Sequence, residues 1–326
     1  MKKRIFAGVT ALVIGAAFAG EMVWAKNFHT AQDETQLQSF LLQKDTDDLS
    51  EKDYDLNGDG VWDGRDLCLL RKQMQEQDKS QITFGTQTND DFLVDNVLHS
   101  DTQGEIHFSS YIPESYDGSE PYALFVTLPG WEGLYFQGVG ANMVEGFPHE
   151  AKKYNDKMII LSPQLNDWGE TSANMAIELT EYFIAHYNID TSRVYLHGMS
   201  GGGETGSIIM GKRPELYTAY LETSSRWDGD LEVLAKARTP VYLAIAENDT
   251  YYGSGYLKNT YQQLYDLYRE QGLTESEIRE ILVLDVRPDS YFTQQGYRDQ
   301  HSGGNAFSAD KEVMGWLFGK VKQQTK

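Results

Sequence analysis

The segment from Gly198 to Gly202 places the strongest constraint on how this chain can fold. It reads Gly-Met-Ser-Gly-Gly and matches G-x-S-x-G, a turn that carries a serine from the end of a β-strand to the start of an α-helix. The β-branched and aromatic residues 193–197 before it favour a strand, and residues 204–210 after it can form a helix. The sequence therefore predicts a serine nucleophile at Ser200.

A serine hydroxyl is a weak nucleophile until a neighbouring base removes its proton. Where this turn carries the nucleophile, a carboxylate and then a histidine follow it along the chain. Of the seven histidines, only His301 lies C-terminal to Ser200, in a glycine-rich segment ahead of the last expected helix. His301 is therefore the predicted base by elimination.

The carboxylate should follow a strand between the nucleophile and the base. Residues 240–246 form the most apolar expected strand in that interval, and Asp249 follows it closely. We predict that Asp249 orients the imidazole and stabilises its charged form. Asp285, at the end of another apolar run, and Glu247, on the same turn as Asp249, are the alternatives.

Negative charge develops on the substrate oxygen during attack and requires backbone N–H donors. One donor is expected at Gly201, directly after the nucleophile, and the other in the loop after an early strand. Residues 124–128 form such a strand and lead into Pro-Gly-Trp. Because Pro129 has no N–H, Gly130 or Trp131 must donate, and Trp131 is favoured. An ordinary Pro-Gly turn is the alternative.

A second motif, in residues 55–66, matches a calcium-binding loop. Oxygen donors fall at loop positions 1, 3, 5, 9 and 12, position 6 is Gly60, and position 7 offers its backbone carbonyl. A helix with apolar spacing is expected to follow. An Asp- and Gly-rich turn that binds nothing is the alternative. The predicted calcium ligands are Asp55, Asn57, Asp59, Val61, Asp63 and Asp66.

Residues 1–25 predict a cleaved signal peptide. The basic residues Lys2 to Arg4 precede an apolar run over residues 5–19, which is of signal-peptide length and short for a membrane span. Cleavage is expected after Ala25, with Ala19 as a second candidate, and an uncleaved anchor is the alternative interpretation. The mature chain is then expected to be secreted and free of the membrane.

Composition narrows the possible partners. The formal net charge of −21 offers no basic stripe to phosphates, which argues against a nucleic-acid partner. Cys68 is the only cysteine, so no intrachain disulfide can form, and in an exported chain this favours a bacterial host. The hydrophobic content of 40% is sufficient for a packed core.

From about residue 100 onward, expected strands and helices alternate, and the central strands are apolar throughout, as in a parallel sheet buried on both faces. This order predicts an α/β fold with a mostly parallel sheet over residues 81–326. Residues 26–80 are expected to form a separate module, with a linker over residues 77–90. The expected strands span 105–112, 122–128, 157–161, 193–196, 219–222, 240–246 and 281–286. The expected helices span 140–154, 171–187, 201–212, 255–271 and 311–321.

The chain resembles secreted α/β-hydrolases of the esterase, polyhydroxybutyrate depolymerase and prolyl-oligopeptidase-like group. The resemblance rests on residues 111–118, the Pro-Gly-Trp turn, residues 189–203 and the downstream aspartate and histidine. It covers about residues 100–320 and implies an α/β-hydrolase fold. Pro129 replaces a histidine that the group usually carries, a change that affects the oxyanion hole and not the triad.

Residues 35–76 resemble a dockerin, a small all-α EF-hand-like module that attaches enzymes to cohesin scaffold proteins. The resemblance rests on the calcium loop, with Asp66 at position 12, and on the residues that follow it. Dockerins usually carry two such loops, whereas only one is intact here, and a helix expected over residues 36–42 takes the place of the other. The resemblance implies bound calcium and a cohesin partner; a calcium-dependent spacer is the alternative.

These features together predict a secreted serine carboxylic ester hydrolase that needs no cofactor for catalysis. Docking on a scaffold makes acetyl or feruloyl esters of plant cell-wall polysaccharides the expected substrates. A prolyl-oligopeptidase-like serine peptidase and a non-catalytic surface protein with a relic triad are the alternatives. Several aromatic residues either line an acyl or sugar pocket or are scattered over core and surface. They are Trp131, Tyr135, Phe136, Trp168, Trp227, Tyr251, Tyr252, Tyr291 and Phe292.

Overall fold

The computed structural model describes residues 37–38, 41, 54–78 and 81–322. The chain divides into two compact units, Met1–Ser80 and Gln81–Lys326, and each is considered by itself. The predicted signal peptide lies outside the described residues, as does most of the helix expected over residues 36–42. Within the described ranges, no helix combines the length and the apolarity needed to cross a bilayer.

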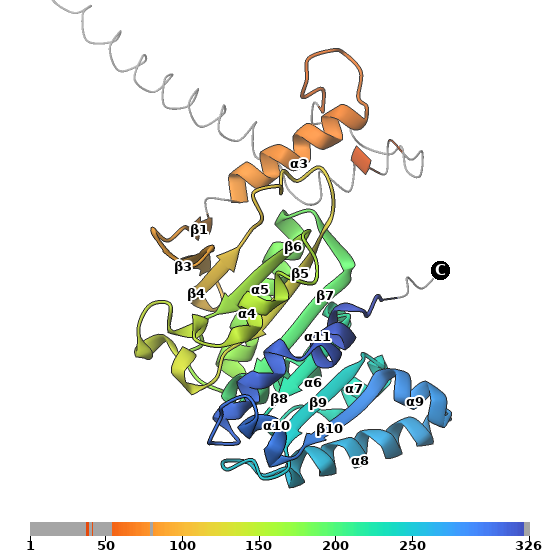
Figure 1. Cartoon of the computed structure of the whole chain (residues 1–326). Helices are drawn as coiled ribbons and strands as arrows, with labels where there is room; N and C mark the ends of the chain where they lie inside the picture. Colours follow the sequence, from red (N-terminus) through yellow and green to blue (C-terminus); the bar gives the residue numbers. More distant parts are fainter. Residues whose placement is uncertain (1–36, 39–40, 42–53, 79–80, 323–326) are drawn as a thin grey trace, which may run out of the picture. The chain divides into compact units, whose positions relative to one another are not determined.

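The first unit contains the predicted calcium loop and the helix α3 (Gly64–Asp78), coloured orange in Figure 1. Leu37, Tyr54 and Leu70 are buried together and form the core of its described part. Trp62 packs edge-on against Tyr54, with the ring centroids 5.5 Å apart. Because hydrophobic stabilisation scales with the apolar area buried, so small a cluster supplies little of it.

A ten-stranded sheet organises the described part of the second unit, in the order β1-β3-β4-β6-β5-β7-β8-β9-β10 with β2 paired to β3 (Figure 1). The strands from β5 to β10 pair in parallel, and the first four strands pair antiparallel. The mostly parallel sheet predicted from the sequence is thus confirmed. The strands are β1 (Ile82–Thr83), β2 (Gln87–Asn89), β3 (Phe92–Ser100), β4 (Gly104–Tyr111), β5 (Tyr122–Leu128), β6 (Met158–Pro163), β7 (Ile189–Met199), β8 (Ala219–Thr223), β9 (Val241–Ala246) and β10 (Leu282–Arg287).

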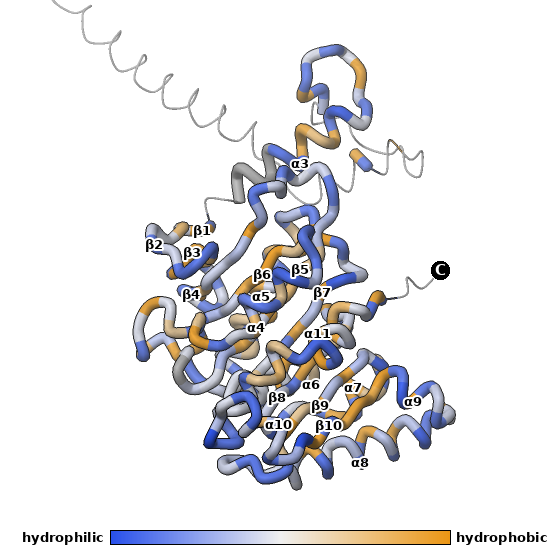
Figure 2. Tube along the Cα trace, in the orientation of Figure 1, coloured by the Kyte–Doolittle hydropathy of each residue, from blue (hydrophilic) through white to orange (hydrophobic). Residues whose placement is uncertain are grey.

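Two apolar cores cover opposite faces of this sheet, because alternate residues of each central strand point to opposite sides. On β5, Leu124 and Val126 enter one core and Phe125 enters the other. Helices α5 to α9 contribute to the first core, and α4 and α11 to the second. Apolar residues concentrate in the central strands, while the outer side of α8 is polar (Figure 2). The helices are α4 (Gly146–Ala151), α5 (Glu170–His186), α6 (Gly201–Lys212), α7 (Leu231–Ala237), α8 (Gly255–Glu270), α9 (Glu275–Ile281), α10 (Asp289–Thr293) and α11 (Lys311–Phe318).

The structure differs from the sequence-based expectation in two segments, residues 77–90 and residues 140–154. The helix expected over residues 140–154 is divided into a 3-10 turn (Ala141–Met143) and α4. Pro148 explains the break, because proline lacks an N–H and fits a helix only in its first turn, so α4 begins at Gly146. The prediction of a linker over residues 77–90 is also wrong. Helix α3 ends at Asp78, and β1 and β2 then pair with β3.

Candidate active site

Ser200 lies in the turn that joins β7 to α6. Its backbone has φ +54° and ψ −123°, a conformation that non-glycine residues rarely adopt and that costs about 1–3 kcal/mol. The Ser200 N–H donates a hydrogen bond to the Thr223 carbonyl on the neighbouring strand at 3.0 Å. A Cβ added to Gly198 or to Gly202 would lie 2.3 Å from a backbone oxygen. Only glycine fits at these positions, and the tight turn presents the serine hydroxyl at the end of the sheet.

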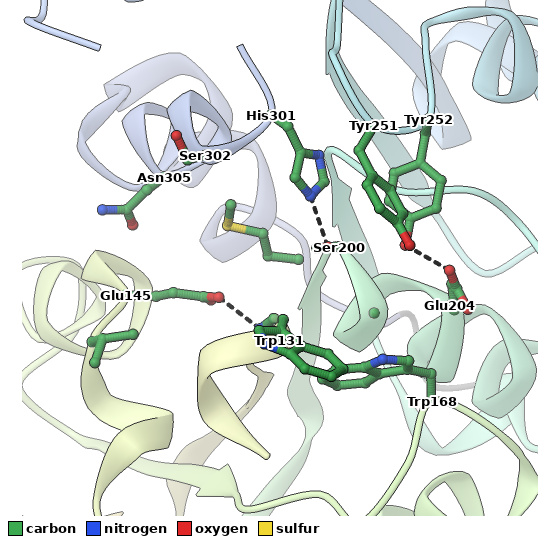
Figure 3. Close-up of a pocket in the computed structure, with 14 residues that line it drawn as sticks. Trp131, Glu145, Trp168, Ser200, Glu204, Tyr251, Tyr252, His301, Ser302 and Asn305 are labelled. Carbon is green, nitrogen blue, oxygen red and sulfur yellow. Dashed lines mark hydrogen bonds between the residues drawn. The ribbon is translucent and has the colours of Figure 1, made fainter. Parts of the chain in front are cut away.

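The structure brings Ser200, His301 and Asp249 together in one hydrogen-bonded series. His301 Nε2 lies 2.9 Å from Ser200 Oγ, and His301 Nδ1 lies 3.0 Å from Asp249 Oδ2. Figure 3 shows the imidazole pointing at the serine. Because an ionised carboxylate can only accept hydrogen bonds, Nδ1 carries the proton and Nε2 is left to accept the serine hydroxyl. Each residue follows a different strand, so the series depends on the sheet.

Asp249 is held ionised by its surroundings. Its other carboxylate oxygen accepts hydrogen bonds from the N–H groups of Tyr251 and Tyr252 at 2.9 and 2.8 Å. Burial acts to raise the pKa of Asp249, but the hydrogen bonds from His301 and from these two amides outweigh it and lower the pKa. A buried carboxylate that keeps its charge can stabilise an imidazolium beside it.

The two alternative carboxylates are engaged elsewhere. Asp285 lies on β10, where it pairs with Arg287 at 2.8 Å and accepts a hydrogen bond from the Tyr242 hydroxyl at 2.8 Å. The Glu247 side chain is exposed at the end of β9. Asp249 is therefore the one of the three candidates that the structure places against His301.

The two predicted oxyanion donors flank the nucleophile. Gly201 begins α6 directly after Ser200, and the Pro-Gly-Trp turn lies beside the serine, since a Cβ on Gly130 would be 3.4 Å from Ser200 Cβ. The Gly130 N–H is occupied, because it donates to Glu145 Oε1 at 2.6 Å. In the described part of the chain, neither the Gly201 nor the Trp131 N–H has a backbone acceptor outside the regular elements. The structure therefore favours Trp131 over Gly130 as the second donor.

A cavity of about 350 Å³ opens at the serine. This volume lies in the range of small-molecule sites. Trp168 packs closely against residues 198–202, the turn that carries the nucleophile and is called the elbow below. A Cβ on Gly201 would lie 2.3 Å from the Trp168 ring. The remaining wall combines aromatic rings with two carboxylates. The lining residues are Gly130, Trp131, Val144, Glu145, Trp168, Met199, Ser200, Gly201, Glu204, Tyr251, Tyr252, His301, Ser302 and Asn305.

One wall of the cavity is a small polar network that the sequence analysis missed. The Tyr252 hydroxyl donates to Glu204 Oε1 at 2.5 Å, and Arg226 pairs with Glu204 Oε2 at 3.5 Å (Figure 3 shows the tyrosine and the glutamate). Burial and the Glu204 carboxylate raise the pKa of Tyr252, so the phenol stays protonated. Because Glu204 follows the elbow by one helical turn, it faces the cavity from α6, a position that the motif alone could have indicated.

The nine aromatic residues singled out in the sequence divide between the cavity and the rest of the unit. Trp131, Trp168, Tyr251 and Tyr252 line the cavity. Trp131 and Tyr251 are more than half exposed, at 56% and 74%. Phe292 is buried in the core. The other four contact further rings outside the cavity lining or at its rim. Tyr135 stacks on His107 and Tyr291 on Phe307, whereas Phe136 packs edge-on against Trp131 and Trp227 edge-on against Tyr220.

The predicted calcium loop folds through hydrogen bonds between its acidic side chains and its backbone. The two carboxylate oxygens of Asp55 accept from the N–H groups of Asp59 and Gly60 at 3.0 and 2.8 Å. Asn57 Oδ1 accepts from the Asp59 N–H at 2.8 Å, and its amide donates to Asp59 Oδ2 at 2.9 Å. Gly60 has φ +81°, the left-handed turn expected at loop position 6. The structure thus brings the first three predicted ligands together.

The last predicted ligand ties the two ends of this loop. Asp66 is fully buried, and its carboxylate accepts from the N–H groups of Leu56, Asn57 and Asp63 at 2.9, 3.2 and 2.8 Å. Burial acts to raise the pKa of Asp66, but the hydrogen bonds from these amides outweigh it and lower the pKa. Val61 is exposed at position 7. Across the described ranges, no three His, Cys, Asp or Glu side chains are placed to hold a metal ion. The oxygen donors suit calcium, and most of the hydrogen bonds that they accept here come from backbone N–H groups.

Sequence comparison places part of the chain beside a known family. The prolyl oligopeptidase family matches residues 164–263. This stretch contains Ser200 and Asp249 and ends before His301. No curated protein matches the chain in sequence.

Solved structures resemble a larger part of the chain. A thermostable esterase has a TM-score of 0.57 at 20% identity, over 72% of this chain and 64% of that chain, which is less than two thirds of its length. An S-formylglutathione hydrolase from Agrobacterium tumefaciens has a TM-score of 0.48 at 16% identity, over 72% of this chain and 99% of that one. A ferulic acid esterase has a TM-score of 0.47 at 14% identity, over 70% and 97%. The chain has an α/β-hydrolase fold, as its sequence predicted.

Proposed function

We propose that this chain is a serine hydrolase that cleaves carboxylic esters through an acyl-enzyme. The observation that carries the proposal is the hydrogen-bonded series in which His301 Nε2 lies 2.9 Å from Ser200 Oγ and Nδ1 lies 3.0 Å from Asp249. These distances suit transfer of the serine proton to the imidazole without rearrangement of the side chains. A nucleophile, a base and an orienting acid are the parts that acyl transfer needs.

In the acylation step, Ser200 Oγ attacks the ester carbonyl while His301 Nε2 takes the hydroxyl proton. The carbonyl oxygen becomes an oxyanion, and the N–H groups of Gly201 and Trp131 donate to it. The tetrahedral intermediate then collapses, the bond to the leaving alkoxide breaks, and the imidazolium returns its proton to that oxygen. An alcohol leaves, and the acyl group stays on the serine.

Deacylation repeats these roles with water as the nucleophile. His301 takes a proton from the water as its oxygen attacks the acyl carbonyl, and the same two amides receive the oxyanion. Collapse expels Ser200 Oγ, which recovers its proton from the imidazolium. A carboxylic acid is released, and the enzyme returns to its starting protonation state.

The direct test replaces the nucleophile. Ser200→Ala is expected to lower kcat on a chromogenic acetyl or butyryl ester by at least about 10⁴-fold, because it removes the covalent route. Ser192→Ala, a serine at the distant start of β7, is the matched control and should keep the wild-type rate. Equal turnover by Ser200→Ala and the wild type would refute the catalytic proposal and leave a relic triad as the better description.

For the substrate, we propose acetyl or feruloyl esters of plant cell-wall polysaccharides. Aromatic rings on the cavity wall support an acyl group or sugar that can stack on them. The carboxylates of Glu145 and Glu204 disfavour anionic acyl groups. A panel of acetyl, butyryl and feruloyl esters compared by kcat/KM tests this choice, and the proposal predicts the lowest value for butyryl. A preference for butyryl esters would contradict it.

A serine peptidase is the second candidate, and the match to the prolyl oligopeptidase family over residues 164–263 favours it. The same triad can cleave amides, because the nucleophile and the oxyanion donors serve both reactions. Peptide p-nitroanilides assayed beside acyl esters separate the two. Turnover of the peptides without any turnover of the esters would replace the esterase proposal.

For the first unit, we propose a dockerin-like module that binds one calcium ion through residues 55–66 and attaches the enzyme to a cohesin scaffold. All-oxygen donors in register with a glycine at position 6 support the ion. The side-chain oxygens of Asp55, Asn57, Asp59, Asp63 and Asp66 and the Val61 carbonyl would hold it. Titration of the full chain against a panel of cohesin domains, with and without calcium, tests the partner. Binding that ignores calcium, or no binding at all, would favour a spacer.

We further propose that the chain is secreted by a bacterium after removal of residues 1–25. The basic start and the apolar run over residues 5–19 support export. Intact-mass measurement of the protein exported by a bacterial host distinguishes a mature chain that begins at Lys26 from one that begins at Gly20. An uncleaved chain in the membrane fraction would contradict the proposal.

A further inference from the structure

Glu145 stands out in the cavity wall because its side chain binds the backbone of the Pro-Gly-Trp turn, which carries the proposed oxyanion donor Trp131. It lies at the start of α4, is 8% exposed, and receives the Gly130 N–H on its Oε1 atom at 2.6 Å. Figure 3 shows its side chain reaching the turn that carries Trp131. A hydrogen bond from a buried amide to a carboxylate is among the stronger kinds in proteins.

The Pro-Gly-Trp turn carries two consecutive backbone N–H groups beside the nucleophile. Pro129 has no N–H, so the Gly130 and Trp131 N–H groups are the two that this turn can provide. Their peptide planes are linked through the Gly130 dihedral angles, φ −75° and ψ −161°. An acceptor that fixes the Gly130 N–H on one side therefore limits where the Trp131 N–H can point. Without that acceptor, a buried donor would be left without a partner, and the turn would reorganise to satisfy it.

We infer that Glu145 is a positioning residue for the oxyanion hole. Its carboxylate occupies the Gly130 N–H and fixes the turn so that the Trp131 N–H donates to the oxyanion. The inference rests on the hydrolase function proposed above. What matters in this role is an acceptor oxygen at the right reach, because a negative charge beside the oxyanion would by itself oppose catalysis.

Three substitutions separate reach from charge. Glu145→Gln keeps an acceptor oxygen at the same reach and is expected to keep kcat within about threefold. Glu145→Asp keeps the charge but shortens the side chain by one methylene, and Glu145→Ala removes the acceptor. Both are expected to lower kcat by about 10²-fold with KM little changed, the loss typical of one oxyanion donor. Glu150→Ala on the same helix, outside the cavity, is the matched control and keeps the wild-type rate.

A boronic acid that forms a tetrahedral adduct with the serine supplies a readout that a change in overall folding would not reproduce. Its affinity for Glu145→Asp should fall by the same factor as kcat, because both report contacts made to the tetrahedral state. Circular dichroism shows whether each variant is folded. If Glu145→Asp retains the wild-type kcat and boronate affinity, or if Glu145→Gln loses as much as Glu145→Asp, the inference is wrong. Absence of ester turnover in the wild type would instead refute the proposed function, and boronate affinity would still test Glu145.

Discussion

The predicted calcium loop and the proposed catalytic triad differ in how far apart their members lie along the chain. The loop uses twelve consecutive residues, 55–66, and the described core of its unit contains Leu37, Tyr54 and Leu70. The triad joins residues 52 and 101 positions apart, on a sheet with an apolar core on each face. A contiguous motif can be ordered locally by an ion, whereas a dispersed one needs a rigid framework.

The largest expected effect is a loss of kcat on substitution of Asp249, the carboxylate of the proposed triad. Asp249→Asn places an amide opposite His301 Nδ1, which favours the wrong tautomer, so kcat should fall by about 10³- to 10⁴-fold. Steady-state kinetics on a chromogenic ester measures it. Asp285→Asn, at the carboxylate that the sequence left as an alternative, should keep the wild-type rate. A loss of kcat of less than tenfold in Asp249→Asn would show that the contact between Asp249 and His301 is not needed to orient the imidazole.

A smaller effect is expected at the loop, and it should leave catalysis untouched. Calcium at about 100 times its dissociation constant should stabilise the first unit by roughly 2.7 kcal/mol, seen in calorimetry as a higher temperature for the unfolding transition of this unit. Asp55→Ala combined with Asp59→Ala should abolish this shift. Esterase kcat/KM should be the same in calcium and in chelator. A calcium response that survives in the double variant would contradict the ligand assignment. Loss of turnover in chelator would show that catalysis depends on the ion and not on the framework of the second unit alone.

The smallest expected effect concerns pH, to which one buried carboxyl group in each unit, Asp66 and Glu222, should respond with opposite sign. Asp66 has a lowered pKa, so its contribution to stability is present above its unfolded value and is lost as pH falls through the folded value. Glu222 on β8 is fully buried, and neither of its carboxylate oxygens has a hydrogen-bond partner within the described residues. Burial raises its pKa well above 4.5, so the native state keeps a proton that the unfolded chain releases. The contribution of Glu222 to the stability of the second unit should therefore fall as pH rises above 4.5.

Glu222→Gln removes this titration without changing the shape of the side chain. Its Tm at pH 8 should exceed that of the wild type by about 2–4 °C, and the difference should shrink towards pH 4. Thermal unfolding followed by circular dichroism across this range measures it. Parallel curves for the two proteins would mean that Glu222 has no raised pKa in the folded state. Glu145→Gln, at a carboxylate that already has a partner, is a useful control for loss of charge alone.

The sequence alone predicted those features that leave a strong local pattern of residues. The elbow places Ser200 through glycine spacing, and chain order leaves only His301 as its base. The apolar central strands were recognisable because both of their faces are buried. The antiparallel strands β1, β2 and β3 were missed. The first two are two and three residues long and mostly exposed, so they carry no apolar pattern, whereas β3 alternates between buried and partly buried residues over Phe92–Ser100.

The parts of the site that escaped prediction depend on contacts across the fold. Glu145 lies 15 residues from Gly130, on a segment whose expected helix is interrupted, and nothing in its sequence surroundings marks a side chain that binds backbone. Tyr252 lies 48 residues from its partner Glu204. Such pairs are set by how the loops end at the edge of the sheet, and a single sequence carries no record of that geometry.

The packing of Gly198 and Gly202 also bears on how the proposed hydrolase could be re-engineered. Any side chain at either glycine would overlap a backbone oxygen, so the nucleophile cannot be retuned from within its own turn. Mutational libraries aimed at a new acyl group should leave residues 198–202 constant. The exposed positions Trp131, Val144 and Tyr251 on the cavity rim are where substitutions can accumulate at little cost to folding. The positions that can be substituted to change specificity are therefore adjacent to the turn that carries Ser200 but separate from it.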